Sequence, residues 1–204
     1  MIRRVLLVAA TPVVAVAAPT HANPPVAPSA KLSDLDTQMI AHQHAVNQTE
    51  IALGKLAESH GTAAVKKYGA MLIKDHGQAD RNITTLAKKK GVTAIPEDMA
   101  LTEDKSAERR TRSSAGGDAK VDDKKDLADK EAKLKGLKGA DFDRMFLDMM
   151  ANGHEREVTK IEADIAVVSD PDLKAMLQKI EPTLRHHEEA AKALQKTVTS
   201  RLEN

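Results

Sequence analysis

YGAMLIKDHGQADRNI, residues 68–83, is the stretch that decides the fold. On a helix, its apolar residues fall on one stripe with a spacing of three or four, and His76 lies in the middle of that stripe. Three other segments have the same pattern, an apolar helical stripe interrupted by a histidine or a glutamate. Four such helices packed together would bring these polar residues to one axis. The sequence therefore predicts an all-α four-helix bundle with a candidate metal site inside it.

The composition supports a helical core. Aromatic residues make up 1% of the chain, with one Tyr, two Phe and no Trp, so the core must consist of aliphatic residues, Met and Ala. The net charge of +1 gives no electrostatic support for binding nucleic acid. The absence of cysteine excludes disulfides, thiolate metal ligands, cysteine nucleophiles and a lipoprotein anchor.

The N-terminus is typical of a signal peptide, which we expect to cover residues 1–22. Arg3 and Arg4 precede an apolar run that is too short and too interrupted to span a membrane. We therefore expect export to the periplasm and no integral membrane segment after cleavage. The next residues, 23–32, are rich in proline and predict a tether.

Residues 33–204 form the expected bundle domain. Its helix boundaries follow from polar N-caps and from terminal glycines. The expected helices are residues 33–60, 62–90, 141–168 and 170 onward, the last beginning at Asp170–Pro171. A kink is expected at Pro182. Between the second and third helices, a charged flexible linker is expected over 92–121, followed by a short helix over 122–137 that rests on the bundle.

The candidate ligands are expected to meet at one depth. An up-down-up-down bundle would place the tight turns at Gly61 and at Ser169–Asp170 at the same end. His76, His154 and His187 then lie roughly 15 to 17 residues from a turn, and therefore at one level at ~1.5 Å per residue. The carboxylates of Glu50 and Glu157 are expected about one turn away. This set of nitrogen and oxygen ligands suits iron, zinc, copper or manganese.

Three interpretations of this site stay open. The first is a metal-binding helical protein that uses the ligands above, as a metal buffer or a stress-resistance protein. His42 lies close to the same level, and Met150 with His154 would suit copper. The second is a cell-envelope interaction or structural protein without metal, in which these residues form a buried hydrogen-bond network. The third is a redox enzyme, which needs an open coordination position. No catalytic triad, phosphate-binding loop or dinucleotide motif is present, so a role without catalysis is favoured.

Four segments also resemble a bacterial family of unknown function, domain-of-unknown-function family 4142. They are TEIALGKLA (49–57), MLIKDHGQADRNITTLAKKKGV (71–92), GADFDRMFLDMMANGHEREV (139–158) and DPDLKAMLQKIEPTLRHHEEAAKAL (170–194). The matching motif residues are Glu50, Asp75–His76, His154 and His187. The resemblance implies a ferritin-like helical fold and export, with members often labelled as outer membrane proteins. It implies no activity, and an envelope partner and self-association into a homo-oligomer stay open.

The sequence departs from the ligand pattern of di-iron carboxylate proteins, which place Glu-x-x-His on two helices. Ile73 lies three residues before His76, and Leu184 lies three residues before His187. A di-iron centre is therefore not expected.

Overall fold

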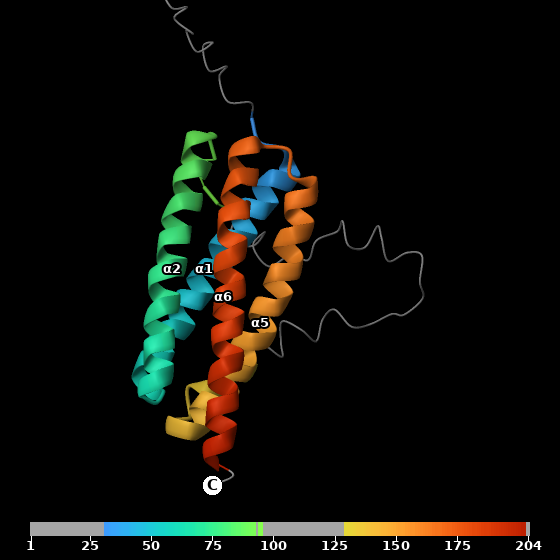
Figure 1. The fold of residues 1–204 in the computed structure, drawn as a ribbon. Helices are drawn as coiled ribbons and strands as arrows, with labels where there is room; N and C mark the ends of the chain where they lie inside the picture. The colour runs from blue at the N-terminus through green and yellow to red at the C-terminus, as the bar shows by residue number, and fades with distance from the viewer. Residues whose placement is uncertain (1–30, 93, 96–128, 203–204) are drawn as a thin grey trace, which may run out of the picture. The chain divides into compact units, whose positions relative to one another are not determined.

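The computed structural model describes residues 31–92, 94–95 and 129–202 (Figure 1). In these ranges the chain forms four long helices and a short helical segment at 129–134. The long helices are α1 (Asp34–His60), α2 (Ala63–Lys89), α5 (Gly139–Val167) and α6 (Pro171–Leu202). The prediction of an all-α bundle is confirmed, and each predicted helix is present. The expected signal peptide and most of the expected tether and linker lie outside the described residues.

The starts of α1 and α6 and the end of α2 follow the expected capping rules. The Ser33 side chain accepts a hydrogen bond from the backbone N of Asp36 (3.0 Å) at the start of α1. Asp170 Oδ1 accepts from the backbone N of Leu173 (2.9 Å), and Pro171 is the first residue of α6. Gly91, which follows α2, has a φ of 82°, the left-handed conformation that glycine allows at a helix end. The helix α6 runs on through Pro182.

The order of helix directions differs from the expected alternation. Thr62, just before α2, donates its backbone N–H to Asp143 near the start of α5 (3.0 Å). Ser169, just before α6, donates its backbone N–H to Asp36 near the start of α1 (3.0 Å). The two tight turns therefore lie at opposite ends of the bundle, and α2 and α5 run in the same direction (Figure 1).

The up-down-up-down prediction was wrong because a connection long enough to span the bundle leaves the direction of the next helix open. A helix of 27 residues, the length of α2, is ~40 Å long, and a fully extended chain covers that distance in about 12 residues. The connection from Lys90 to Lys138 is several times longer than this. It can return the chain to the end of the bundle where α2 began, and the starts of α2 and α5 are in fact side by side there.

The core consists of two apolar clusters, one in each half of the bundle. One contains Tyr68, Phe142 and Phe146, and the other contains Ile40, Ile83 and Leu177. Each helix crosses from one cluster to the other near its middle, where buried polar residues replace apolar ones. We call these residues the polar layer: Gln43, Asn47, Glu50, His76, His154 and His187.

The short segment at 129–134 contributes to the core. Leu134 is fully buried in the cluster that contains Phe142 and Phe146. The predicted short helix is therefore present over part of its expected range, and it fills core volume in addition to covering the bundle. Its expected first residues, 122–128, lie outside the described part of the chain.

The helices α1 and α2 approach closely at two glycines. A Cβ atom on Gly69 would lie 2.6 Å from the carbonyl oxygen of Gly54 and 2.8 Å from Cβ of Ala57. A Cβ atom on Gly54 would lie 2.8 Å from the carbonyl oxygen of Gly69. Because backbone atoms cannot move aside as flexible side chains do, the separation of these two helices depends on glycine at both positions.

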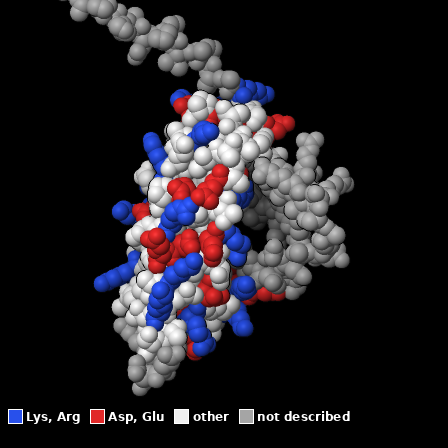
Figure 2. All heavy atoms as spheres, turned by 45° about the vertical axis from the view of Figure 1, so that its right-hand side comes forward, with Lys and Arg blue, Asp and Glu red and all other residues white. Residues whose placement is uncertain are grey.

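The exposed face of α5 and α6 carries interleaved charges of both signs (Figure 2). Arg185 on α6 pairs with Glu162 on α5, and Lys192 on α6 lies 3.6 Å from Glu155 on α5. Exposed pairs of this kind contribute little to stability, so the apolar clusters provide most of the packing energy. Among the described helices, none has the length and apolar character that crossing a bilayer would require.

Asp36→Asn is expected to lower the free energy of unfolding by about 1–2 kcal/mol at pH 7. Burial raises the pKa of the Asp36 carboxyl, but hydrogen bonds from Ser169 and Ser33 outweigh burial and hold this pKa below its ordinary value of 3.8. The unfolded state therefore takes up the proton at a higher pH than the folded state. The stabilisation is present above about pH 4 and is lost as the pH falls through the folded pKa.

Urea unfolding between pH 2 and pH 7 measures this effect. Asp34, which is exposed in the same turn, supplies the control Asp34→Asn, which should follow the wild-type acid curve. An acid curve for Asp36→Asn that also matches wild type would show that the contact with Ser169 contributes nothing.

Candidate metal centre

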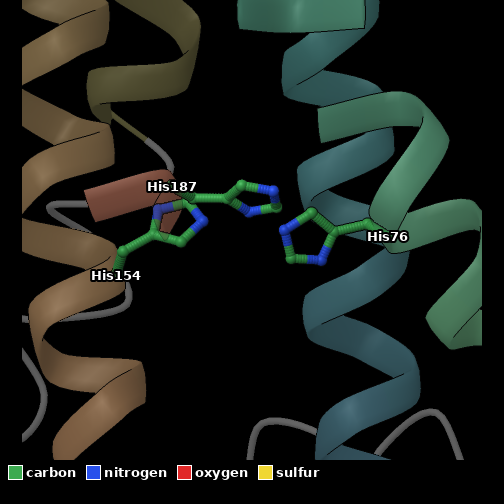
Figure 3. A group of neighbouring side chains, drawn as sticks. All are labelled: His76, His154 and His187. Carbon is green, nitrogen blue, oxygen red and sulfur yellow. The ribbon is translucent and has the colours of Figure 1, made fainter. Parts of the chain in front are cut away.

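Three histidines from three helices converge in the polar layer (Figure 3). His76 comes from α2, His154 from α5 and His187 from α6, and each is at most 3% exposed. One ring nitrogen from each histidine lies within 4.8 Å of the others. The ring centroids are 5.1 to 5.8 Å apart. No other group of three or more such side chains close enough to share a metal ion occurs among the described residues.

Each histidine has its other ring nitrogen hydrogen-bonded to a neighbour. His76 Nδ1 donates to the side-chain oxygen of Asn47 (3.0 Å), and His154 Nδ1 donates to the backbone oxygen of Met150 (2.9 Å). His187 Nε2 donates to the carboxylate of Asp75 (3.2 Å). Metal-bound histidines typically have such outer partners, which fix the orientation of the ring and the position of its proton.

These hydrogen bonds leave three unpaired nitrogens, His76 Nε2, His154 Nε2 and His187 Nδ1. A carbonyl and a carboxylate can only accept, so the proton of His154 lies on Nδ1 and that of His187 lies on Nε2. The free nitrogens therefore present lone pairs. A single water has two protons and can satisfy two such acceptors, whereas a metal ion satisfies all three.

The histidines are neutral, which is the form that binds metal. Burial lowers the pKa of His154 to about 4. Burial, followed by repulsion from His187 and His154, holds the pKa of His76 well below its ordinary value. Burial also lowers the pKa of His187, and the contact with Asp75 only partly offsets this.

The spacing of the three nitrogens is close to that of a tetrahedral site. Two nitrogens bound to one zinc at ~2.0–2.1 Å lie roughly 3.4 Å apart, while the nitrogens of the cluster lie within 4.8 Å. Binding therefore requires nitrogens that lie at the full 4.8 Å to approach each other by roughly 1.4 Å. The residues fit a transition metal in ligand type, protonation and outer hydrogen bonds.

Glu50, a predicted ligand, is buried in the polar layer on α1 but lies outside the group of three histidines. Its Oε2 has no hydrogen-bond partner. Burial, and then the negative charges of Glu157 and Glu131, raise the pKa of the Glu50 carboxyl to about 8. The carboxyl is therefore neutral at pH 7, in contrast to the ionised ligand that we expected.

Glu157, the other predicted carboxylate, pairs with His42 instead of joining the cluster. The Glu157 oxygens lie 3.1 and 3.2 Å from His42 Nε2, and both side chains are 21% exposed. The changed helix order explains this pair, because His42 lies nearer to the end of the bundle where the α5–α6 turn is. His42 is thus separated from the three buried histidines.

Three polar neighbours of the site were absent from the sequence prediction or had no role in it. Asn47 and Gln43 are both buried on α1, although neither was among the candidate residues. The inner face is in fact marked by the spacing of Asp36, Gln43, Asn47, Glu50, Gly54 and Ala57. This spacing is visible in the sequence, but polar residues and glycine do not stand out in a search for apolar periodicity. Asp75 entered the sequence analysis only as a motif residue, and its bond to His187 is a finding of the structure.

Tyr68 connects the histidine cluster to the apolar cluster that contains Phe142 and Phe146. Its hydroxyl donates to the backbone oxygen of His187 (3.0 Å), and burial raises the pKa of this hydroxyl above its ordinary value. Tyr68 thus connects α2 to α6 at the position of the ligand. The contact limits the rotation of α6 about its axis and helps to fix the direction of the His187 side chain.

Glu50→Gln is expected to remove most of a fall in the stability of the metal-free wild-type protein, which amounts to roughly 3–4 kcal/mol between pH 5 and pH 8. The folded state retains the Glu50 proton up to a pH of about 8, whereas the unfolded state releases it near 4.5. Wild-type stability should therefore fall as the pH rises between these values. Glutamine keeps the neutral shape and removes this fall.

Urea unfolding of chelator-treated protein at pH 5 and pH 8 tests this prediction. Glu58 is exposed on the same helix, so Glu58→Gln should leave the pH dependence unchanged. The same loss of stability between pH 5 and pH 8 in Glu50→Gln and wild type would mean that Glu50 is ionised in the folded state.

The fold and the site together define an all-α bundle with a buried cluster of three histidines, of a kind that can hold a metal ion. Residues 21–194 match the family described as "Domain of unknown function (DUF4142)", and the chain belongs to this family. A comparison with curated proteins gives no match, and neither does a comparison with solved structures.

Proposed function

We propose that this protein binds a transition metal ion through His76, His154 and His187. The observation that carries the proposal is the convergence of three unpaired, buried imidazole nitrogens, each on a ring oriented by a second hydrogen bond. An ion would supply a positive charge and a Lewis acid in the middle of the bundle. The all-nitrogen ligand set suits zinc, copper or iron better than magnesium or calcium.

The proposed role is to bind metal outside the cytoplasm. The N-terminal residues Arg3 and Arg4, followed by an apolar run, support export by way of a signal peptide. An exported metal-binding protein without cysteine keeps its ligands in an oxidising compartment, because imidazole does not form disulfides. Metal buffering and stress resistance are the functions that we infer for it in the periplasm.

The metal content of the purified protein tests the proposal. The protein is purified without chelator, its metal is measured by elemental mass spectrometry, and the ligands are counted by X-ray absorption. We expect stoichiometric metal with three imidazole ligands. In His187→Ala the affinity should fall by at least about 100-fold, since loss of an outer partner alone typically costs 10–100-fold.

His186→Ala is the matched control, because His186 is the exposed neighbour of His187 on the same helix. It should bind metal as wild type does. Equal loss in both variants would indicate a surface site. No metal in wild type, even after reconstitution, would support the alternative of a buried polar network that fixes helix register in an envelope protein.

A further inference from the structure

A groove between α2 and α6 leads to the histidine cluster. Its volume is about 740 Å³, within the usual range of small-molecule sites. His76 and His187 both line it, as does Asp75. From there it runs along the two helices toward Lys89 and Asp172, which lie 3.2 Å apart as an ion pair. The groove therefore reaches the side chains of two of the three candidate ligands, whose free nitrogens lie buried behind its inner end.

Both walls of the groove combine polar and apolar side chains. The α2 wall includes Gln78 and Leu86, and the α6 wall includes Lys179 and Ile180. Such a mixed lining is typical of sites for small molecules.

The charges of the groove favour an anion once a metal is bound. Lys179 lines the groove and has no ion-pair partner in the described part of the chain. Asp75 accepts the ring N–H of the neutral His187 and keeps its own negative charge. A bound divalent ion would add two positive charges near the inner end of the groove. Together with Lys179, these charges outweigh that of Asp75 and favour an anion in the groove.

The histidines supply three ligands, and the carboxyl of Glu50 lies outside their group. Metal sites with three protein ligands keep a further position for water or for an exogenous ligand. We propose that the groove between α2 and α6 binds a small anion that coordinates the metal at this further position. This proposal rests on the proposed function, because the anion needs a metal to coordinate.

The test uses cobalt as the metal and azide as the anion. Cobalt(II) bound by three imidazoles absorbs visible light, and its bands shift when a further ligand binds. We expect azide to shift the bands of the wild-type protein in a saturable manner. In Ala79→Leu and Thr183→Leu, which fill the groove from its two walls, the affinity for azide should fall at least about tenfold.

Ala52→Leu is the matched control, because Ala52 lines a separate hollow between α1 and the segment at 129–134. It should bind cobalt and azide as wild type does. Because the groove is open space, both groove variants should also bind cobalt, and loss of cobalt from both would overturn the proposal.

Two further outcomes would overturn the proposed anion site in the groove while leaving the metal site intact. In the first, cobalt binds through three imidazoles but azide leaves the wild-type bands unchanged, so the coordination position is closed. In the second, azide binds equally in wild type and in both groove variants, so it arrives by another route. Failure of cobalt itself to bind would instead remove the proposed function.

Discussion

Saturating zinc is expected to raise the melting temperature of the chelator-treated protein by roughly 8–16 °C. A ligand that binds only the folded state stabilises it by about 4.1 kcal/mol at 1,000 times its Kd. For a domain of this size, 1 kcal/mol corresponds to about 2–4 °C. The gain arises because the three nitrogens come from α2, α5 and α6, which adopt this arrangement only in the folded bundle. Differential scanning calorimetry with increasing zinc measures the shift.

The rise in melting temperature should depend on His76, His154 and His187 and on no other histidine. His187→Ala should lose nearly all of it, and His186→Ala, at the exposed neighbouring position, should retain it. The melting temperature should also keep rising with the logarithm of the zinc concentration above Kd. A wild-type melting temperature that is the same with zinc and with chelator would contradict the proposed metal site.

Gly69→Val is expected to destabilise the protein by about 3 kcal/mol, which corresponds to roughly 6–12 °C. Even the first atom of the new side chain would lie 2.6 Å from the backbone oxygen of Gly54. Neither backbone can yield without moving its whole helix, so α1 and α2 must separate. That separation would loosen the contacts that surround Ala57 and Leu53. Thermal and urea unfolding measure the loss.

Gly77→Ala is the control on the same helix. A Cβ atom at Gly77 would contact only the end of the flexible Arg81 side chain, at 3.6 Å. Alanine has the higher helix propensity, so this variant should be more stable than wild type by about 0.5–1 kcal/mol. If Gly69→Val melts as high as Gly77→Ala, then α1 and α2 do not depend on this close approach.

The sequence predicts the helices well because the signals for them are local. Ser33 and Asp170 mark the starts of α1 and α6 through caps that act within a few residues. The direction of α5 relative to α2 is not local, since it depends on where a long connection brings the chain back. The hydrogen bonds between Thr62 and Asp143 reflect this direction. They join residues far apart in the sequence, and no local sequence pattern predicts them.

The three histidines meet as predicted, although the predicted helix order was wrong, and the reason is geometric. His76, His154 and His187 each lie near the middle of their helices, and reversing a helix about its centre leaves its middle at the same level. His42 lies nearer to one end of α1, so its level changes with the order of the helices. The roles of Asn47 and Asp75 needed the structure, because a hydrogen bond between side chains depends on helix rotation.

The long connection between α2 and α5 divides the chain into two hairpins, α1–α2 and α5–α6, and most helix contacts lie within each hairpin. His76 belongs to the first hairpin, and His154 and His187 belong to the second. An ion held by all three would therefore cross-link the hairpins, closing a loop of chain as a disulfide does. In a protein without cysteine, such a cross-link would form and open with the supply of metal in the surroundings.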